Sequence, residues 1–133
     1  MRPERAPRAA LLVRVSTREQ HLTEQFRVLR REAEHRGWRV VAVYREREST
    51  RHDRPQLKRL LADGMLRRWD SLLVLRLDRL GRSLIETLTN VQRLHARGVK
   101  VVSVRDGALD TSTASGQFQL AMLCACAAYE REL

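Results

Sequence analysis

The chain alternates short apolar runs with amphipathic helical segments, and this alternation constrains its fold more than any other feature. Four runs rich in Leu and Val have the length of β-strands: 9–15, 38–44, 71–77 and 99–104. Strands that alternate with helices pair in parallel through right-handed crossovers. The runs are apolar throughout, so both sheet faces should be covered. The sequence therefore predicts an α/β fold, a three-layer open, mainly parallel sheet of about four to five strands with flanking helices.

Capping signals indicate where the helices begin. Thr17-x-x-Gln20 and Ser83-x-x-Glu86 have the form of capping boxes. Asp53 is a candidate N-cap for the helix between them. The apolar faces expected to turn inward contain Leu22, Phe26, Leu29 and Ala33 in the first helix, Leu57, Leu60 and Leu61 in the second, and Leu84, Leu88, Val91 and Leu94 in the third.

A final helix is predicted from Gly116 onward. Residues 120–128 (LAMLCACAA) are apolar at every position, so this helix should be buried on more than one side. A chain of 133 residues supplies one core of ordinary size. We therefore favour a subunit interface over burial within a larger core. The helical pattern continues to Leu133, as expected of a helix that extends further.

Composition indicates a basic protein without a membrane segment. Lys and Arg number 26 against 16 Asp and Glu, a formal net charge of +10. Such a surface favours phosphate-rich partners, although a solubilising, arginine-rich surface explains the charge equally well. No apolar run approaches the roughly 20 residues of a membrane helix. The first apolar stretch is too short for a signal peptide and is interrupted by Arg14. We expect a cytoplasmic protein with no membrane contact.

Side chains suited to phosphate chemistry follow the predicted strands, at the edge where open parallel sheets bind ligands. They lie in three segments, 14–17, 53–55 and 78–82. Arg14 and Ser16 are two apart at a strand end, so their side chains should share a face. A guanidinium beside a hydroxyl can bind phosphate oxygens and stabilise the serine as it loses its proton. Arg79 and Arg82 could clamp further oxygens. Taken singly, each arginine is better explained as a solvated surface residue, and it is their convergence on the strand ends that favours a site.

Two of these segments resemble the signature motifs of serine site-specific recombinases, the resolvase/invertase family. They are RVSTREQ at 14–20 and LDRLGRS at 77–83. DRP at 53–55 lies between them, where that family has it, and AYEREL at 128–133 resembles the start of the family's long dimerisation helix. The four motifs occur in the family's order and the resemblance runs from around Leu11 to the end of the chain.

The resemblance implies a site-specific recombinase that cleaves and rejoins DNA through a 5′-phosphoserine link to Ser16, without a metal or any other cofactor. Arg14, Arg79 and Arg82 would hold the scissile phosphate, with Arg54 assisting. Asp78 would orient these arginines or protonate the leaving oxygen. Further positions that match the family are Gln20, Glu46, Ser49, Glu130 and Arg131.

The resemblance also implies partners and domain organisation. The partners would be double-stranded DNA and a second copy of the chain, in a homodimer that pairs into a tetramer on DNA. Residues 1–133 would form the resolvase-like catalytic domain, with 117–133 the start of the long C-terminal dimerisation helix and a DNA-binding domain downstream. Leu12 occupies a position where many members carry Tyr, so a phosphate contact from that position is lost.

Three other functions are weighed against this one. A metal-dependent nuclease needs clustered carboxylates, and Asp78, Asp106 and Asp110 do not cluster with the first motif in the sequence. A non-catalytic or regulatory DNA-binding relative would be expected to lose Ser16 or an arginine of the site. A histidine-activated serine hydrolase would carry a Gly-x-Ser-x-Gly elbow, which this sequence lacks. The histidines are interpreted as surface residues: His21, His35, His52 and His95.

Overall fold

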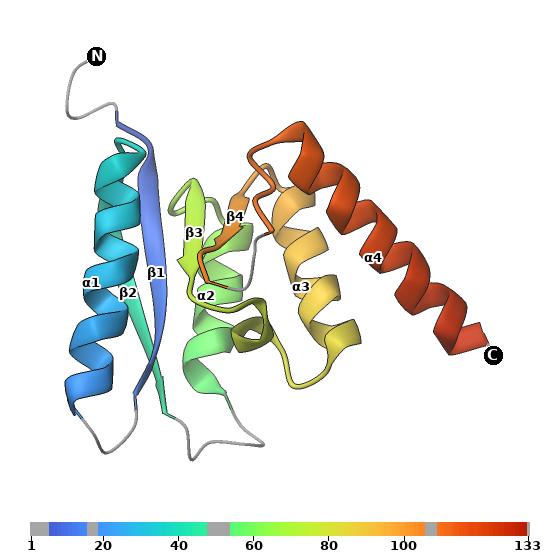
Figure 1. The fold of residues 1–133 in the computed structure, drawn as a ribbon, viewed down its shortest axis with the longest axis horizontal. Helices are drawn as coiled ribbons and strands as arrows, with labels where there is room; N and C mark the ends of the chain where they lie inside the picture. The colour runs from blue at the N-terminus through green and yellow to red at the C-terminus, as the bar shows by residue number, and fades with distance from the viewer. Residues whose placement is uncertain (1–5, 16–18, 48–53, 106–108, 133) are drawn as a thin grey trace.

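The computed structural model describes residues 6–15, 19–47, 54–105 and 109–132. Its strands form one parallel sheet in the order β2-β1-β3-β4 (Figure 1). The strands are β1 (Arg8–Val15), β2 (Arg39–Arg47), β3 (Ser71–Val74) and β4 (Lys100–Ser103). The helices are α1 (Glu19–His35), α2 (Pro55–Met65), the 3₁₀ helix η2 (Leu77–Leu80), α3 (Leu84–Ala96) and α4 (Ala114–Glu132). The prediction of an α/β fold with a parallel sheet is confirmed.

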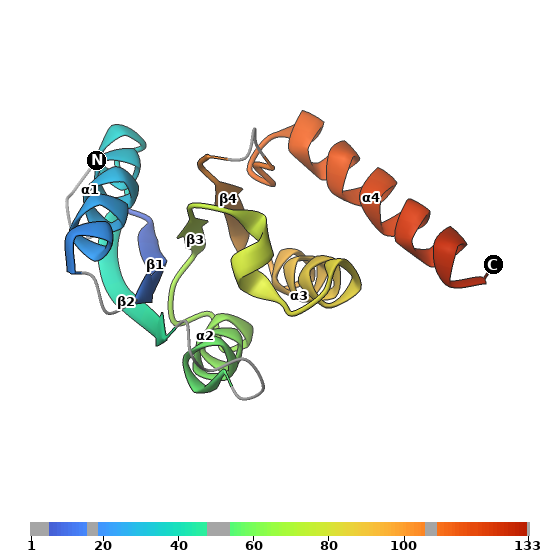
Figure 2. The ribbon, with the colours of Figure 1, turned by 60° about the horizontal axis from the view of Figure 1, so that its bottom comes forward.

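Helices cover both faces of the sheet. Successive residues of β1 point to opposite sides and are mostly apolar, so each face needs helices to bury it. Leu11 and Val13 pack with Leu29 and Ala33 of α1 in one buried cluster. On the other face, a second buried cluster joins the strands to α2, α3 and α4. It includes Ala10, Leu12, Leu57, Leu60, Leu88, Val91, Leu94 and Leu120. The three layers are visible in Figure 2, with α1 on one side of the sheet and α2 and α3 on the other.

The strand order creates a switch point between β1 and β3. The chain passes from β1 to β2 through α1, then returns past β1 to β3 through α2 on the opposite face. Where crossovers leave in opposite directions, the carboxyl ends of the two central strands border an open crevice. The end of β1 at Val15 and the segment after Val74 of β3 therefore lie at the position where this fold class binds its ligands.

Two strand boundaries differ from the predictions. Residues 45–47, which lie beyond the predicted strand 38–44, continue β2 because they remain paired with Val13, Arg14 and Val15 of β1. The apolar pattern ends before these charged residues. They can still belong to β2, because it is an edge strand and Arg45 and Arg47 are exposed. Residues 75–77, predicted as strand, lie beyond β3, and Leu77 begins η2, which buries Leu80 completely.

Helix starts also depart from the predictions in part. The Ser83 cap is confirmed, because its Oγ accepts from the Glu86 backbone N–H at 3.1 Å. Leu84, expected inside, is 58% exposed because it occupies the first turn, beyond the face that packs on the sheet. The N-cap of α2 is Arg54, and Asp53 lies outside the described residues, as does Thr17. α4 begins at Ala114, two residues before the predicted start.

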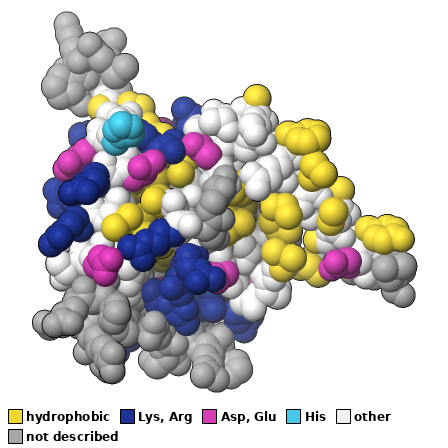
Figure 3. All heavy atoms as spheres, viewed as in Figure 1, with side chains coloured by type: hydrophobic (Ala, Val, Ile, Leu, Met, Phe, Trp, Pro, Cys, Tyr) yellow, Lys and Arg dark blue, Asp and Glu magenta, His cyan; other side chains and the backbone are white. Residues whose placement is uncertain are grey.

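One side of α4 packs against the rest of the chain and the other side is exposed. Leu120 and Ala127 are buried in the core, whereas Phe118, Met122 and Tyr129 are each more than half exposed. Figure 3 shows apolar side chains gathered along this helix. The predicted burial on more than one side is therefore not found within a single copy. In the described part of the chain, no helix has both the length and the apolar character needed to cross a bilayer.

Candidate active site

The carboxyl end of β1 is held in place by a glutamine of α1. The side-chain amide of Gln25 donates to the Arg14 carbonyl at 2.9 Å, and its oxygen accepts from the Arg14 backbone N–H at 3.0 Å. Both hydrogen-bonding groups of Arg14's backbone are thus fixed, and its side chain is half-buried. Ser16, two residues further on, lies outside the described residues. The sequence analysis did not single out Gln25, because nothing in the sequence shows that a helix glutamine will reach back to a strand end.

The segment that follows β3 carries three more of the predicted site residues, Asp78, Arg79 and Arg82, and we call residues 76–82 the arginine turn. Arg76 Nη2 lies 3.2 Å from Asp78 Oδ2, and both side chains are more than half exposed. Arg79 is half-buried, with its Nε atom in the interior. Arg82 is exposed and lies 3.6 Å from the Glu86 carboxylate. The structure therefore pairs Asp78 with Arg76, which the predicted set of site residues did not include.

Arg54 links the start of α2 to the arginine turn. Its Nη1 donates to the Gly81 carbonyl at 3.1 Å. The start of α2 is in turn tied to the end of β2, because Glu46 Oε2 accepts from the Leu57 backbone N–H at 2.8 Å. A carboxylate at this point satisfies an N–H that has no partner within the helix, and it complements the helix dipole. Glu46 was noted for its resemblance to a family position, and here its contact fixes the helix that positions Arg54.

The arginine turn is packed tightly against α3. Leu80 is fully buried, and Gly81 lies so close to Thr87 that an added Cβ would overlap the Thr87 backbone nitrogen. The backbone of Gly81 is extended, a conformation open to any residue, so it is this close approach that requires glycine here. Burial of one residue and close packing of the next leave the turn little freedom. The arginines on either side, Arg79 and Arg82, are thereby carried on a rigid support.

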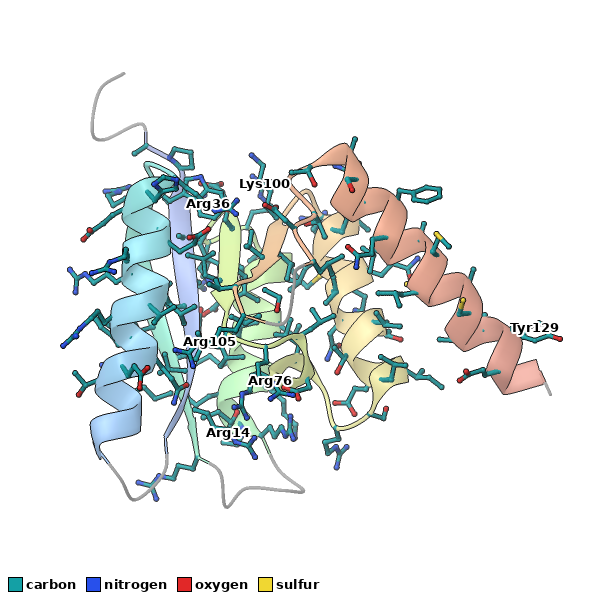
Figure 4. The ribbon with its side chains drawn as sticks, in the orientation of Figure 1. Arg14, Arg36, Arg76, Lys100, Arg105 and Tyr129 are labelled. Atoms are coloured by element: carbon teal, nitrogen blue, oxygen red, sulfur yellow. The ribbon has the colours of Figure 1, made fainter. Side chains whose placement is uncertain are left out.

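These segments bring a group of guanidinium groups to one edge of the sheet. Figure 4 shows Arg14 and Arg76 at the lower, carboxyl edge, with Arg105 nearby. Figure 3 shows Lys and Arg side chains gathered over the same region. Arg105 follows β4 and pairs with Glu24 of α1 at 3.2 Å. Several cations at a switch point form a site for an anion, and planar guanidinium groups match the oxygens of a phosphate.

Four of the predicted supporting residues are not placed in this site. Ser49 lies outside the described residues. Gln20 falls in α1 and Arg131 in α4, but their side chains are not described. Glu130 is exposed near the far end of α4, which runs away from the sheet (Figures 1 and 2). Within one copy, the described cluster therefore consists of Arg14, Arg54 and the arginine turn.

The carboxylates considered for a metal site have other partners or are not described. Asp110 Oδ2 lies 2.9 Å from Arg36, and its other oxygen accepts from Ser112. Burial alone would raise the pKa of Asp110, but the hydrogen bonds from Ser112 and Arg36 outweigh it and the pKa is lowered. Asp106 lies outside the described residues. Among the residues that the structure describes, no three His, Cys, Asp or Glu side chains are grouped to hold a metal ion.

The fold and the site together define an α/β domain with an arginine-rich anion site at the switch point of a parallel sheet. Comparison with known proteins identifies its family. The family model described as the resolvase N-terminal domain matches residues 9–133. The chain belongs to this family.

Relatives whose names give their activity agree with this family assignment. A DNA-invertase of Enterobacteria phage P7 is 39% identical over 122 residues, which cover 91% of this chain and 61% of the relative. The serine recombinase gin of Escherichia phage Mu is 44% identical over 84 residues, covering 63% of this chain and 42% of the relative. The transposon Tn917 resolvase of Enterococcus faecalis is 31% identical over 121 residues, covering 90% and 61%. The chain thus spans about three-fifths of the length of the first of these relatives.

Solved structures agree with the observed fold. The N-terminal catalytic domain of TP901-1 integrase superposes with a TM-score of 0.81 at 34% identity, covering 94% of this chain and 97% of that one. A resolvase family site-specific recombinase from Streptococcus pneumoniae has a TM-score of 0.76 at 26% identity, covering 95% and 89%. The predicted resemblance to serine recombinases is confirmed.

Proposed function

We propose that this domain cleaves and rejoins DNA at specific sites, through a 5′-phosphoserine link to Ser16. The observation that carries the proposal is that the end of β1, with Arg14, and the arginine turn after β3 both lie at the carboxyl edge of the sheet, at its switch point. The names of the relatives, DNA-invertase and serine recombinase, support the same reaction class.

The proposed reaction exchanges one phosphoester for another. The Ser16 oxygen attacks the scissile phosphorus, the new Oγ–P bond forms, and the bond to the 3′ oxygen breaks. The serine proton passes to a base, and the leaving 3′ oxygen takes up a proton. Because the ester energy is conserved in the serine link, a 3′-hydroxyl can reverse the step and rejoin strands. No metal or high-energy cofactor is needed in this scheme.

The arginines supply the charge stabilisation that phosphoryl transfer requires. In this proposal Arg14, Arg79 and Arg82 bind the non-bridging oxygens, and Arg54 assists while it holds the turn through the Gly81 carbonyl. We assign Asp78 an orienting role, because its carboxylate lies 3.2 Å from Arg76 at the edge of the same site. Arg76 then joins the phosphate-binding group.

The proposed partners are double-stranded DNA and further copies of the chain. The exposed side of α4, with Phe118, Met122 and Tyr129, supports a dimer formed through this helix, and the family resemblance extends this to a tetramer on DNA. Residues 1–133 alone should bind DNA weakly and lose affinity steeply with salt, because arginine–phosphate contacts depend on counterion release.

Cleavage of a nicked DNA site by the full-length protein in EDTA tests the proposal. We expect cleavage without metal, and Ser16→Ala should abolish it while DNA binding stays nearly unchanged. Thr17→Ala is the matched control, since it removes the neighbouring hydroxyl and should leave cleavage intact. Cleavage that requires Mg²⁺, or that survives in Ser16→Ala, would overturn the proposal in favour of a metal-dependent nuclease or another nucleophile.

A further inference from the structure

Asn90 is a buried polar residue on the apolar face of α3, and the function proposed above does not account for it. Only 6% of its surface is exposed, and its helix neighbours on the same face include Thr87, Val91 and Leu94, all buried. An amide loses its hydration when it is buried, which costs free energy unless a hydrogen bond replaces the water. A leucine has a similarly branched side chain and would not carry that cost at this position.

The hydrogen bond that Asn90 makes leads to the arginine turn. Its Nδ2 donates to the backbone carbonyl of Leu80 at 2.6 Å. The identity of the donor is fixed by chemistry, since a carbonyl only accepts and the amide nitrogen must therefore face it. Leu80 is the last residue of η2, and its side chain is fully buried. The bond thus fixes the orientation of the Leu80 peptide, at the point where the chain leaves η2 for Gly81.

Two consecutive carbonyls of the arginine turn are therefore held by side chains from two different helices. Asn90 of α3 binds the Leu80 carbonyl, and Arg54 at the start of α2 binds the Gly81 carbonyl. Arg79 precedes this pair of peptides and Arg82 follows it. A rotation of the Leu80 peptide would move the two guanidinium groups relative to each other. Phosphoryl transfer is sensitive to such displacement, because its catalysis is mainly positioning and charge stabilisation.

We propose that Asn90 is a positioning residue for DNA cleavage, which holds the Leu80 carbonyl and thereby sets the relative placement of Arg79 and Arg82. The proposal rests on the function proposed above. Asn90 does not itself contact DNA in this account. Its loss should therefore lower the rate of the chemical step and leave DNA affinity unchanged.

The test compares Asn90→Leu with Val91→Ala in the full-length protein. Val91 is fully buried beside Asn90, so its truncation weakens the core without removing the bond to the arginine turn. We expect Asn90→Leu to lower the single-turnover cleavage rate at saturating DNA by roughly 10- to 100-fold, with an unchanged Kd for DNA. Val91→Ala should lower Tm at least as much and still cleave at the wild-type rate. Equal rates in Asn90→Leu and wild type would overturn the proposal.

A spectroscopic measurement separates this inference from the function on which it rests. The Gly81 amide nitrogen is conjugated to the Leu80 carbonyl, so its ¹⁵N chemical shift should change in Asn90→Leu and not in Val91→Ala. If the wild-type protein does not cleave DNA, the proposed function fails, and this shift still decides whether Asn90 holds the turn. An unchanged Gly81 shift would contradict the inference while leaving the proposed function intact.

A second variant covers the case in which Asn90→Leu does not fold. Asn90→Ser keeps a small polar group, but its hydroxyl is too short to span the distance to the Leu80 carbonyl, so the same loss of rate is expected. If neither variant folds while Val91→Ala does, Asn90 is structural only and the positioning role is wrong.

Discussion

Three arginines of the candidate site, Arg14, Arg76 and Arg82, each have a local contact that holds them. Gln25 fixes the backbone of Arg14, Asp78 lies against Arg76, and Glu86 lies against Arg82. Of these pairs the two ion pairs are exposed and contribute little stability, because water screens them. Their value in this account is orientation: each carboxylate keeps a guanidinium at the sheet edge until a phosphate takes its place.

Truncation of the site arginines should affect cleavage far more than binding. Arg14→Ala and Arg82→Ala are each expected to lower the cleavage rate by roughly 100- to 1,000-fold, as loss of one preorganised donor does elsewhere. Arg105→Ala is the control, since Arg105 is also exposed and ion-paired beyond a strand end, but it follows the edge strand β4 and does not belong to the arginine turn. Single-turnover cleavage at saturating DNA measures the effect, and an Arg105→Ala loss as large as the other two would contradict the assigned site.

The sequence points to the proposed catalytic residues but not to the residues that hold their segments in place. Arg14, Arg79 and Arg82 are candidates because they follow apolar runs and lie within family-like motifs. Gln25 and Asn90 were missed, because each reaches back from a helix to the segment before it, and such a contact depends on the path of the connecting turn. Asn90 did leave a signal, a polar residue within the inward helical positions Leu88, Val91 and Leu94.

At the scale of elements, a buried tyrosine joins β2 to α2 and to the segment before β3. The Tyr44 hydroxyl donates to Asp63 Oδ2 at 2.6 Å and accepts from Trp69 Nε1 at 2.9 Å. The two rings also pack edge to face, with centroids 6.2 Å apart. Tyr44 and Trp69 are both nearly inaccessible to solvent. Burial, reinforced by the hydrogen bond to Asp63, raises the pKa of Tyr44 to about 12.

This pKa predicts a loss of stability in strong alkali. The folded-state pKa of Tyr44 lies above its ordinary value of 10.0, so the stabilisation is complete below pH 10 and is lost as pH rises through about 12. The free energy of unfolding should fall by up to about 3 kcal/mol across this window. Urea unfolding at several pH values checks this, with Tyr44→Phe expected to remove most of the slope and Tyr129→Phe, an exposed control, expected to keep it.

Element boundaries were predicted where packing and propensity agree, and missed where they conflict. Residues 45–47 are charged yet pair with β1, because an edge strand can direct such side chains to solvent. Residues 75–77 are largely apolar yet leave the sheet, because burial of Leu80 in η2 competes with extension of β3. In both cases the hydrophobic pattern predicts which side chains are buried. It does not predict whether the backbone that carries them is strand or helix.

For the whole molecule, the net charge fits a phosphate-rich partner and a solubilising surface equally well, and it does not say where such a partner would bind. Basic residues also occupy the amino edge of the sheet, where Arg8 and Arg67 share the carboxylate of Asp70. Burial alone would raise the pKa of Asp70, but the hydrogen bonds from Arg8 and Arg67 outweigh it and the pKa is lowered. The topology, through its switch point between β1 and β3, is what distinguishes the carboxyl edge as the site.

The exposed side of α4 should control assembly. Met122→Asp places a charge in the middle of this apolar face and is expected to shift the protein from dimer to monomer. Leu66→Asp is the matched control, because Leu66 is equally exposed but follows α2, on a different part of the surface. Sedimentation of the folded variants measures the change. An unaltered dimer in Met122→Asp, or loss of the dimer in Leu66→Asp, would argue against α4 as the interface.

The covalent link itself tests the central claim most directly. The full-length protein is trapped on a nicked DNA site in EDTA, denatured and digested, and the DNA-linked peptide is sequenced by mass spectrometry. We expect a single attachment, with the 5′-phosphate of the cleaved strand joined to the oxygen of Ser16. A link to any other residue, attachment through the 3′ end, or cleaved DNA without a protein link would contradict it.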